Sequence, residues 1–190
     1  QDRMHLVEKA LGGTPLIEPP VANTNTKTIT FFHDFASPYS YLGSTQIERV
    51  ADQCGVRIEY KPLLLGALFG AIGTADIPMM TFGQAKRDYI MRDMMDWAQW
   101  WDIPFRFAPT FPIRSVTPLR VALVQPATTH TMYKAAWVDG INVGDTEALQ
   151  KVLDQAGFDG AALIAQTQDP AIKAVLRTNT EEAVTLGLCG

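Results

Sequence analysis

The sequence predicts an α/β fold in which a β-α-β unit is followed by an inserted, all-helical subdomain. Residues 28–62 give the β-α-β pattern, because two short strand-like runs flank one helical segment. Residues 63–165 give helical patterns only, and residues 166–190 give one further helix that returns to the first unit. A chain of 190 residues with 47% hydrophobic residues is large enough to bury one good core.

The N-terminal segment divides into a helix and a linker. Residues 1–13 carry an apolar stripe at helical spacing, and Gly12 and Gly13 stop it. Residues 14–27 contain three prolines and little periodicity, which is typical of a linker.

The β-α-β unit begins at residues 28–33, where threonine, isoleucine and phenylalanine favour a strand. A helix is expected over residues 38–54, closed by Gly55, and a second strand over residues 56–61. The short return between helix and strand implies a right-handed crossover and a parallel pair of strands.

The inserted subdomain is expected to hold several helices around an irregular, proline-containing loop at residues 102–114. On the long helix over residues 82–101 we expect Tyr89, Ile90, Met94, Trp97 and Trp101 on the buried side. Several methionines either line an apolar pocket or belong to plain core: Met79, Met80, Met91, Met94 and Met95. The other helical patterns cover residues 63–72, 115–124, 128–139, 145–156, 159–166 and 169–187.

Composition and residue spacing exclude several classes of function. A net charge of −4 without a basic cluster argues against nucleic acid as a partner, and no apolar run is long enough to span a membrane. Cys54 and Cys189 are far apart, so the chain has neither a dithiol redox motif nor a zinc knuckle. The three histidines are equally dispersed, which predicts no metal site. A reducing cytoplasm is the default compartment for such a chain, which starts without a signal-peptide pattern.

The most informative local pattern is Ser37-Pro38 at the start of the first predicted helix. Serine is a favoured N-cap and proline a favoured first helical residue, so the Ser37 hydroxyl is expected at a helix N-terminus. Backbone N–H groups and the positive end of the helix dipole would stabilise an anion there, such as a thiolate. Because the residue is serine, the thiolate must come from another molecule. The alternative is a plain helix cap.

A series of short motifs runs through nearly the whole chain in a specific order and spacing. It consists of Asp34-Phe-Ala-Ser37-Pro38-Tyr39-Ser-Tyr41-Leu42, Tyr60-Lys-Pro62-Leu-Leu-Leu65-Gly66, Lys86-Arg87-Asp88-Tyr89, Phe111-Pro112 with Arg120, and Asp169-Pro170 followed by Asn179-Thr180-Glu181-Glu182. In these motifs the chain resembles the 2-hydroxychromene-2-carboxylate isomerases, the kappa-class glutathione transferases and the wider DsbA-like branch of thioredoxin folds. The resemblance implies a thioredoxin-like fold of the DsbA/kappa type, with glutathione as the cofactor.

The resemblance also implies roles for particular residues. Ser37 matches the serine that hydrogen-bonds the glutathione sulfur in the family, and Thr74 takes the place of an asparagine that contacts the glutathione backbone. Tyr39 and Arg114 are the candidates for binding the substrate, and Arg114 could pair with a carboxylate as a bidentate fork. Asp2 and Arg3 match a pair that binds the γ-glutamyl end of glutathione in the family.

The order of the motifs departs from the family. Residues 1–13 resemble the closing helix of the family, and the strand pair with a cis proline that should follow Glu181 to Gly190 is not in the sequence. Either the chain is cut from a longer tandem protein or the domain is circularly permuted. In both cases a homodimer, or an exchange of strands with another copy, would be one remedy for an exposed sheet edge.

The leading functional interpretation is a glutathione-dependent isomerase or transferase that acts on a small, unsaturated, aromatic-type carboxylate. The thiolate would add to an unsaturated carbon, and rotation and elimination would then isomerise the substrate. The first alternative is a degenerate thioredoxin-like module that binds without catalysis. The second is a thiol–disulfide oxidoreductase of the DsbA type, which serine at the nucleophile position argues against.

Overall fold

A computed structural model of the chain describes residues 27–189. The predicted N-terminal helix, and the predicted linker up to residue 26, lie outside these residues. The elements follow the order β1 (Thr28–His33), α2 (Pro38–Ser44), α3 (Ile47–Cys54), β2 (Arg57–Pro62), α4 (Leu65–Ala71), α5 (Pro78–Thr81), α6 (Gln84–Trp100), α7 (Val116–Val124), a short 3-10 helix (Pro126–Thr128), α8 (Thr129–Trp137), α9 (Thr146–Gln155), α10 (Gly160–Gln166) and α11 (Pro170–Thr185).

The two strands form a parallel pair, as the short crossover predicts. Thr28 lies opposite Arg57 and His33 lies opposite Pro62 at the two ends of the register. Gly55 ends α3 in the left-handed region, at φ 62°, which costs a glycine little. The described part of the chain therefore holds a two-stranded sheet of order β1-β2.

The crossover between the strands consists of two helices, so the expectation of one continuous helix over residues 38–54 was wrong. The hydroxyl of Ser44 donates to the carbonyl of Tyr41, and that of Thr45 donates to the carbonyl of Leu42, each at 2.7 Å. Such back-bonding competes with the regular helical bonds and bends the chain. As a result α2 ends at Ser44 and α3 begins at Ile47, after Gln46 at φ −115°.

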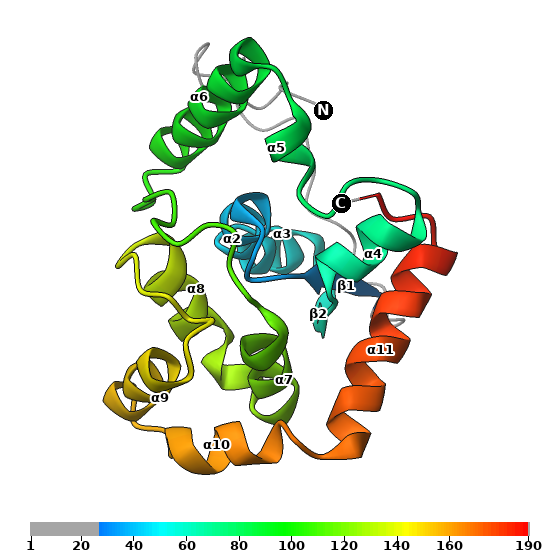
Figure 1. Cartoon of the computed structure of the whole chain (residues 1–190), viewed down its shortest axis with the longest axis vertical. Helices are drawn as coiled ribbons and strands as arrows, with labels where there is room; N and C mark the ends of the chain where they lie inside the picture. Colours follow the sequence, from blue (N-terminus) through cyan, green and yellow to red (C-terminus); the bar gives the residue numbers. More distant parts are fainter. Residues whose placement is uncertain (1–26, 190) are drawn as a thin grey trace.

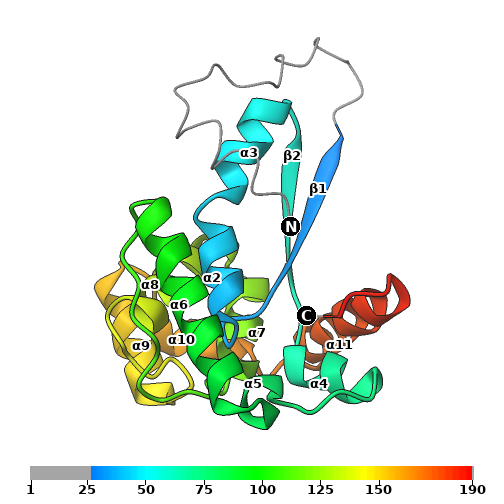
Figure 2. The same ribbon diagram turned by 90° about the horizontal axis from the view of Figure 1, so that it is seen from above.

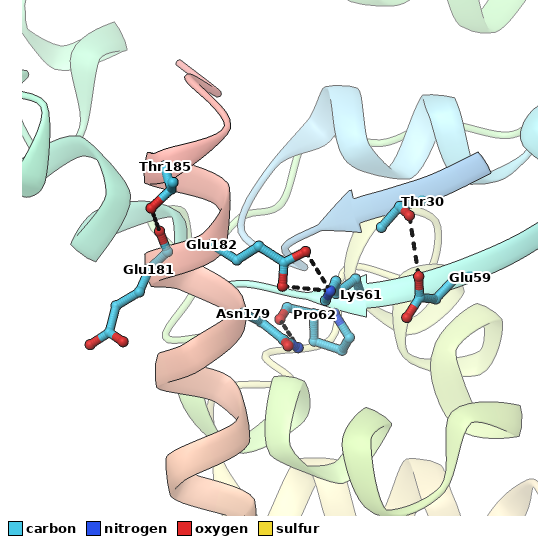
Figure 3. A network of polar contacts seen from close by, with 8 residues as sticks. All are labelled: Thr30, Glu59, Lys61, Pro62, Asn179, Glu181, Glu182 and Thr185. Carbon is cyan, nitrogen blue, oxygen red and sulfur yellow. Dashed lines mark hydrogen bonds and ion pairs between the residues drawn. The ribbon is translucent and has the colours of Figure 1, made fainter. Parts of the chain in front are cut away.

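Helices cover the strands from two sides. In Figures 1 and 2, α2 and α3 lie on one side of β1 and β2, and α11 lies on the other. Polar contacts fasten α11 to β2: Lys61 pairs with Glu182 at 2.6 Å, and the Asn179 amide donates to the carbonyl of Pro62 at 3.0 Å (Figure 3). This arrangement of helices around a small sheet confirms the predicted α/β class.

The inserted helices gather around one large core. Trp137, Tyr133, Phe35, Met94 and Leu149 are among its fully buried members. Figure 1 shows α7 to α10 at one end of the molecule and α5 and α6 at the other, with α2 between them. The core is therefore continuous from the β-α-β unit into the insertion.

The prediction for the long helix holds only in part. Met94 is fully buried, and Trp97, Trp101 and Ile90 pack against the core, but Tyr89 is 62% exposed and was wrongly placed on the buried side. Among the described elements α6 contacts chiefly α2, so only a narrow stripe of it is covered. Tyr89 is turned about 100° from Ile90 around the helix axis and lies outside that stripe.

Two absences apply to the part of the chain that the structure describes. No helix between residues 27 and 189 has both the length and the hydropathy to cross a membrane. Nor do histidine, cysteine and carboxylate side chains in that range form a group of three that could hold a metal ion.

Candidate active site

Ser37 caps α2, and its hydroxyl keeps one hydrogen-bonding function free. Its Oγ accepts from the backbone N–H of Ser40 at 3.2 Å, while its own N–H donates to the carbonyl of Asp34 at 3.0 Å. Pro38 occupies the first helical position. Among the hydrogen bonds of residues 27–189, none takes up the hydroxyl proton of Ser37, so this proton is free to be donated to a ligand.

Two cavities meet at Ser37. The larger has a volume of about 610 Å³ and lies between the loop before α2, the starts of α4 and α7, and the segment from Asp76 to Ile90. The smaller, of about 280 Å³, lies along β1 and reaches Leu188 and Cys189. Both are lined by Asp34, Ser37, Tyr39 and Leu65, which form the shared wall. A molecule in either cavity can therefore touch the same serine.

The larger cavity is mainly apolar with a few polar groups. Met79, Phe82, Met94 and Phe111 supply apolar surface, and Phe111 precedes Pro112 through a cis peptide bond. Polar groups come from Arg114, Asp76, Ser115 and Thr117. Such a lining suits a flat, apolar molecule that carries one or two charged groups.

Asp34 is almost completely buried in the shared wall, with 3% of its surface exposed. Its Oδ1 accepts from the N–H of Ala36 at 2.9 Å, and its Oδ2 accepts from the N–H of Leu65 at 2.8 Å. Burial raises the pKa of this carboxyl, while the hydrogen bonds from Ala36, Ser115 and Leu65 act in the opposite direction. Asp34 thus connects the loop that carries Ser37 to the start of α4.

A buried polar network lies behind the serine. The hydroxyl of Tyr133 lies 2.6 Å from the Oγ of Ser40 and 3.3 Å from the Nδ1 of His33. His33 is 2% exposed, and burial, with a smaller contribution from His130, lowers its pKa to about 3. The imidazole is therefore neutral at pH 7, and its Nε2 has no hydrogen-bond partner among the described residues.

The predicted site residues are only partly brought together. Ser37, Tyr39 and Arg114 all line the larger cavity. The hydroxyl of Tyr39 donates to Asp93 on α6 at 3.0 Å, so it is already engaged. Thr74 is exposed and lines neither cavity, whereas Asp76, two residues further on, lines the larger one. Asp2 and Arg3 lie outside the described residues.

Several residues of the site were missed by sequence reasoning. Asp34 was noted only as part of a motif, although its spacing of three residues before Ser37 was the available signal. Ser115 and Thr117 follow a proline-containing loop whose path the sequence does not reveal. Of the methionines proposed for a pocket, Met79 and Met94 line the larger cavity, and Met80 and Met95 are exposed.

Comparison with known proteins identifies the family of this chain. Residues 28–190 match the family model of the DSBA-like thioredoxin domain. The chain is 27% identical over 175 residues to a 2-hydroxychromene-2-carboxylate isomerase of Sphingobium xenophagum, across 87% of this chain and 86% of that protein. It is 24% identical over 180 residues to glutathione S-transferase kappa 2 of Caenorhabditis elegans, across 87% and 79%.

The fold has a counterpart among solved structures. The structure of a 2-hydroxychromene-2-carboxylate isomerase superposes with a TM-score of 0.75 over 86% of this chain and 82% of that one, at 24% sequence identity. Together with the parallel β1-β2 pair and the inserted helices, the match over residues 28–190 shows that this chain belongs to the DSBA-like thioredoxin family.

Proposed function

We propose that this protein is a glutathione-dependent isomerase or transferase that acts on an unsaturated, aromatic-type carboxylate. The names of its relatives, an isomerase of 2-hydroxychromene-2-carboxylate and a kappa glutathione transferase, support both the chemistry and the substrate class. The observation that carries the proposal is Ser37, which lines both cavities and whose hydroxyl proton has no acceptor among the described residues.

The proposed role of Ser37 is to hold the glutathione sulfur as a thiolate. A hydroxyl that already accepts from the Ser40 N–H is polarised toward donation, and a charge-assisted O–H···S⁻ bond favours the thiolate over the thiol. Because Ser37 touches both cavities, glutathione in the smaller one would present its sulfur to a substrate in the larger one. The apolar lining of the larger cavity fits the aromatic part of that substrate.

The chemistry balances without a further reactant. The thiolate sulfur forms a bond to an unsaturated carbon, and the π electrons move onto the conjugated carbonyl group of the substrate. Rotation about the carbon–carbon bond, now single, changes the geometry. The electrons then return to form the double bond, the carbon–sulfur bond breaks and the thiolate is released. In a transferase the adduct would instead take up a proton and leave.

Arg114 is the proposed partner of the substrate carboxylate, because it is the cationic side chain among the described residues that line the larger cavity. Tyr39 would contact the substrate through its ring, since its hydroxyl is bound to Asp93. Thr74, Asp2 and Arg3 remain predictions for contacts with glutathione.

The experiment combines binding and turnover. Glutathione is titrated by calorimetry, and isomerisation of 2-hydroxychromene-2-carboxylate is followed by absorbance with and without glutathione. Loss of one charge-assisted hydrogen bond in Ser37→Ala is worth about 1.5–3 kcal/mol, so kcat/KM should fall roughly 10- to 100-fold. Asp159→Ala is the control, because Asp159 caps α10 through the N–H of Ala162 at 2.9 Å and lines neither cavity.

Other outcomes would point to other functions. Absence of glutathione binding would favour a non-catalytic thioredoxin-like module. Reduction of insulin disulfides would indicate an oxidoreductase of the DsbA type. Equal activity of Ser37→Ala and the parent protein would contradict the role given to the serine.

The proposal includes a compartment and a partner. A reducing cytoplasm agrees with the two free and exposed thiols of Cys54 and Cys189. Among the described residues β1 pairs with β2 on one side alone, so its other edge could accept a strand from a second copy. Sedimentation analysis would detect the resulting dimer.

A further inference from the structure

Asp34 is a buried carboxylate at the junction of three segments that line the larger cavity. These segments are the loop that carries Ser37, the start of α4 and the start of α7. Both carboxylate oxygens accept backbone N–H groups, from Ala36 and from Leu65. The side chain of Ser115, the residue before α7, also acts on this carboxyl and lowers its pKa.

The starts of α4 and α7 depend on this carboxylate because they lack caps of their own. Leu64 occupies the N-cap position of α4, where an apolar side chain cannot accept a hydrogen bond. The N–H of Leu65 is satisfied instead by Asp34, which is 31 residues earlier in the chain. Ser115 occupies the N-cap position of α7, but its side chain does not cap its own helix and instead acts on the Asp34 carboxyl, whose pKa it lowers.

The same geometry argues against a direct chemical role for Asp34. A general acid or base must exchange a proton with a ligand, and both oxygens of Asp34 are already held by backbone donors. With 3% of its surface exposed, the carboxylate offers almost no area to a molecule in the cavity. Burial of a carboxylate costs free energy, so the benefit of Asp34 must come from the chain segments that its hydrogen bonds hold together.

We propose that Asp34 is a positioning residue that holds Ser37 in register with the starts of α4 and α7 and thereby fixes the shape of the larger cavity. What that shape serves rests on the function proposed above. The contacts of the carboxylate do not depend on that function and can be tested separately.

Asp34→Asn tests the contacts with little change in volume. The amide oxygen can still accept one backbone N–H, but the amide nitrogen faces the other and cannot accept it. The amide hydrogen of Ala36 or Leu65 should therefore exchange with deuterium about tenfold faster or more, as measured by NMR. The control is Asp154→Asn, because Asp154 accepts the N–H of Gly160 at 2.8 Å and lines neither cavity.

In the control the amide oxygen can still accept the single N–H of Gly160, so exchange at Gly160, Ala36 and Leu65 should all stay at the parental rates. Ser115→Ala is a second variant that leaves the carboxylate in place and removes one of its contacts. Unchanged exchange at both Ala36 and Leu65 in Asp34→Asn would overturn the proposal.

Turnover measurements test whether the contacts of Asp34 matter for catalysis. Misplacement of Ser37 relative to the substrate should lower kcat about tenfold or more in Asp34→Asn, while KM for glutathione changes little. Ser115→Ala should have a smaller effect, and Asp154→Asn should retain parental kinetics. Parental kcat and KM in Asp34→Asn would refute the positioning role. A parent protein without turnover would overturn the proposed function alone, and the exchange rates at Ala36 and Leu65 would still decide whether Asp34 positions the loop.

Discussion

Replacement of Tyr133 by phenylalanine should destabilise the protein by more than its single lost oxygen suggests. The hydroxyl of Tyr133 lies 2.6 Å from the Oγ of Ser40 and 3.3 Å from the Nδ1 of His33, inside the core. Ser40 would keep the N–H of Asp34 as a donor at 3.3 Å. His33 would keep nothing, because its Nε2 already lacks a partner among the described residues.

The expected magnitude follows from these two losses. A typical hydrogen bond contributes about 1 kcal/mol net, and a buried group left without a partner costs about 1–3 kcal/mol more. We therefore expect Tyr133→Phe to lower the free energy of unfolding by roughly 2–4 kcal/mol. For a chain of this length that corresponds to a decrease in Tm of about 4–16 °C.

Tyr41→Phe is the matched control. Its hydroxyl donates to the carbonyl of Pro104 at 2.6 Å, and Pro104 is exposed, so water can replace the lost donor. The expected cost is about 1 kcal/mol. Guanidinium denaturation at pH 7, followed by tryptophan fluorescence, measures the free energy of unfolding of both variants. The comparison requires that both variants show the same dependence of this free energy on denaturant concentration. If Tyr133→Phe cost no more than Tyr41→Phe, the argument that His33 depends on this hydroxyl would be refuted.

Three further predictions concern the site and its surroundings. Ser37→Cys should give a thiol with a pKa below the ordinary value, since the start of α2 stabilises an anion, and a titration by alkylation rate that shows an unperturbed thiol would contradict the placement. Burial lowers the pKa of His33 to about 3, so acidification from pH 6.5 toward 3 favours the unfolded state, which binds the proton. His33→Phe should remove this loss, so between pH 6.5 and 3 its free energy of unfolding should rise relative to that of the parent by up to roughly 4 kcal/mol. Urea titrations at several pH values measure both free energies, and a difference between variant and parent that does not change with pH would contradict the prediction. A Cβ at Gly144 would lie 2.8 Å from the carbonyl oxygen of Arg114, whereas one at Gly70 meets nothing within 4 Å. Gly144→Ala should therefore cost about 1–3 kcal/mol and Gly70→Ala, inside α4, should gain about 0.5–1 kcal/mol, and thermal melts giving both variants the same sign would refute the steric argument.

The sequence predicted those parts of the fold that depend on local pattern. Ser37-Pro38 marked the start of α2, and Gly55 marked the end of α3 in the left-handed region. The parallel pairing of β1 and β2 followed from the length of the connection between them. In each case the residues that determine the feature are neighbours in the chain.

The parts that were missed depend on contacts between distant residues. The break after Ser44 arises from hydroxyl groups that bond to preceding carbonyls, which propensity does not reveal. Tyr89 was placed on the wrong side because the width of the covered stripe on α6 is set by α2, far away in sequence. Asp34 gains its importance from Leu65, whose N–H it accepts across 31 residues. No local pattern carries that information.

Substitutions in the shared wall of the two cavities differ in their effect from substitutions elsewhere in the larger cavity. A substitution at Ser37 or Leu65 alters both cavities at once, so it changes reactivity together with recognition. Substitutions at Phe82, Met94 or Phe111 touch the larger cavity alone. Substrate preference can therefore change through single substitutions in the apolar lining of the larger cavity, while Ser37 and its surroundings stay the same. Both natural variation and protein engineering could use such substitutions.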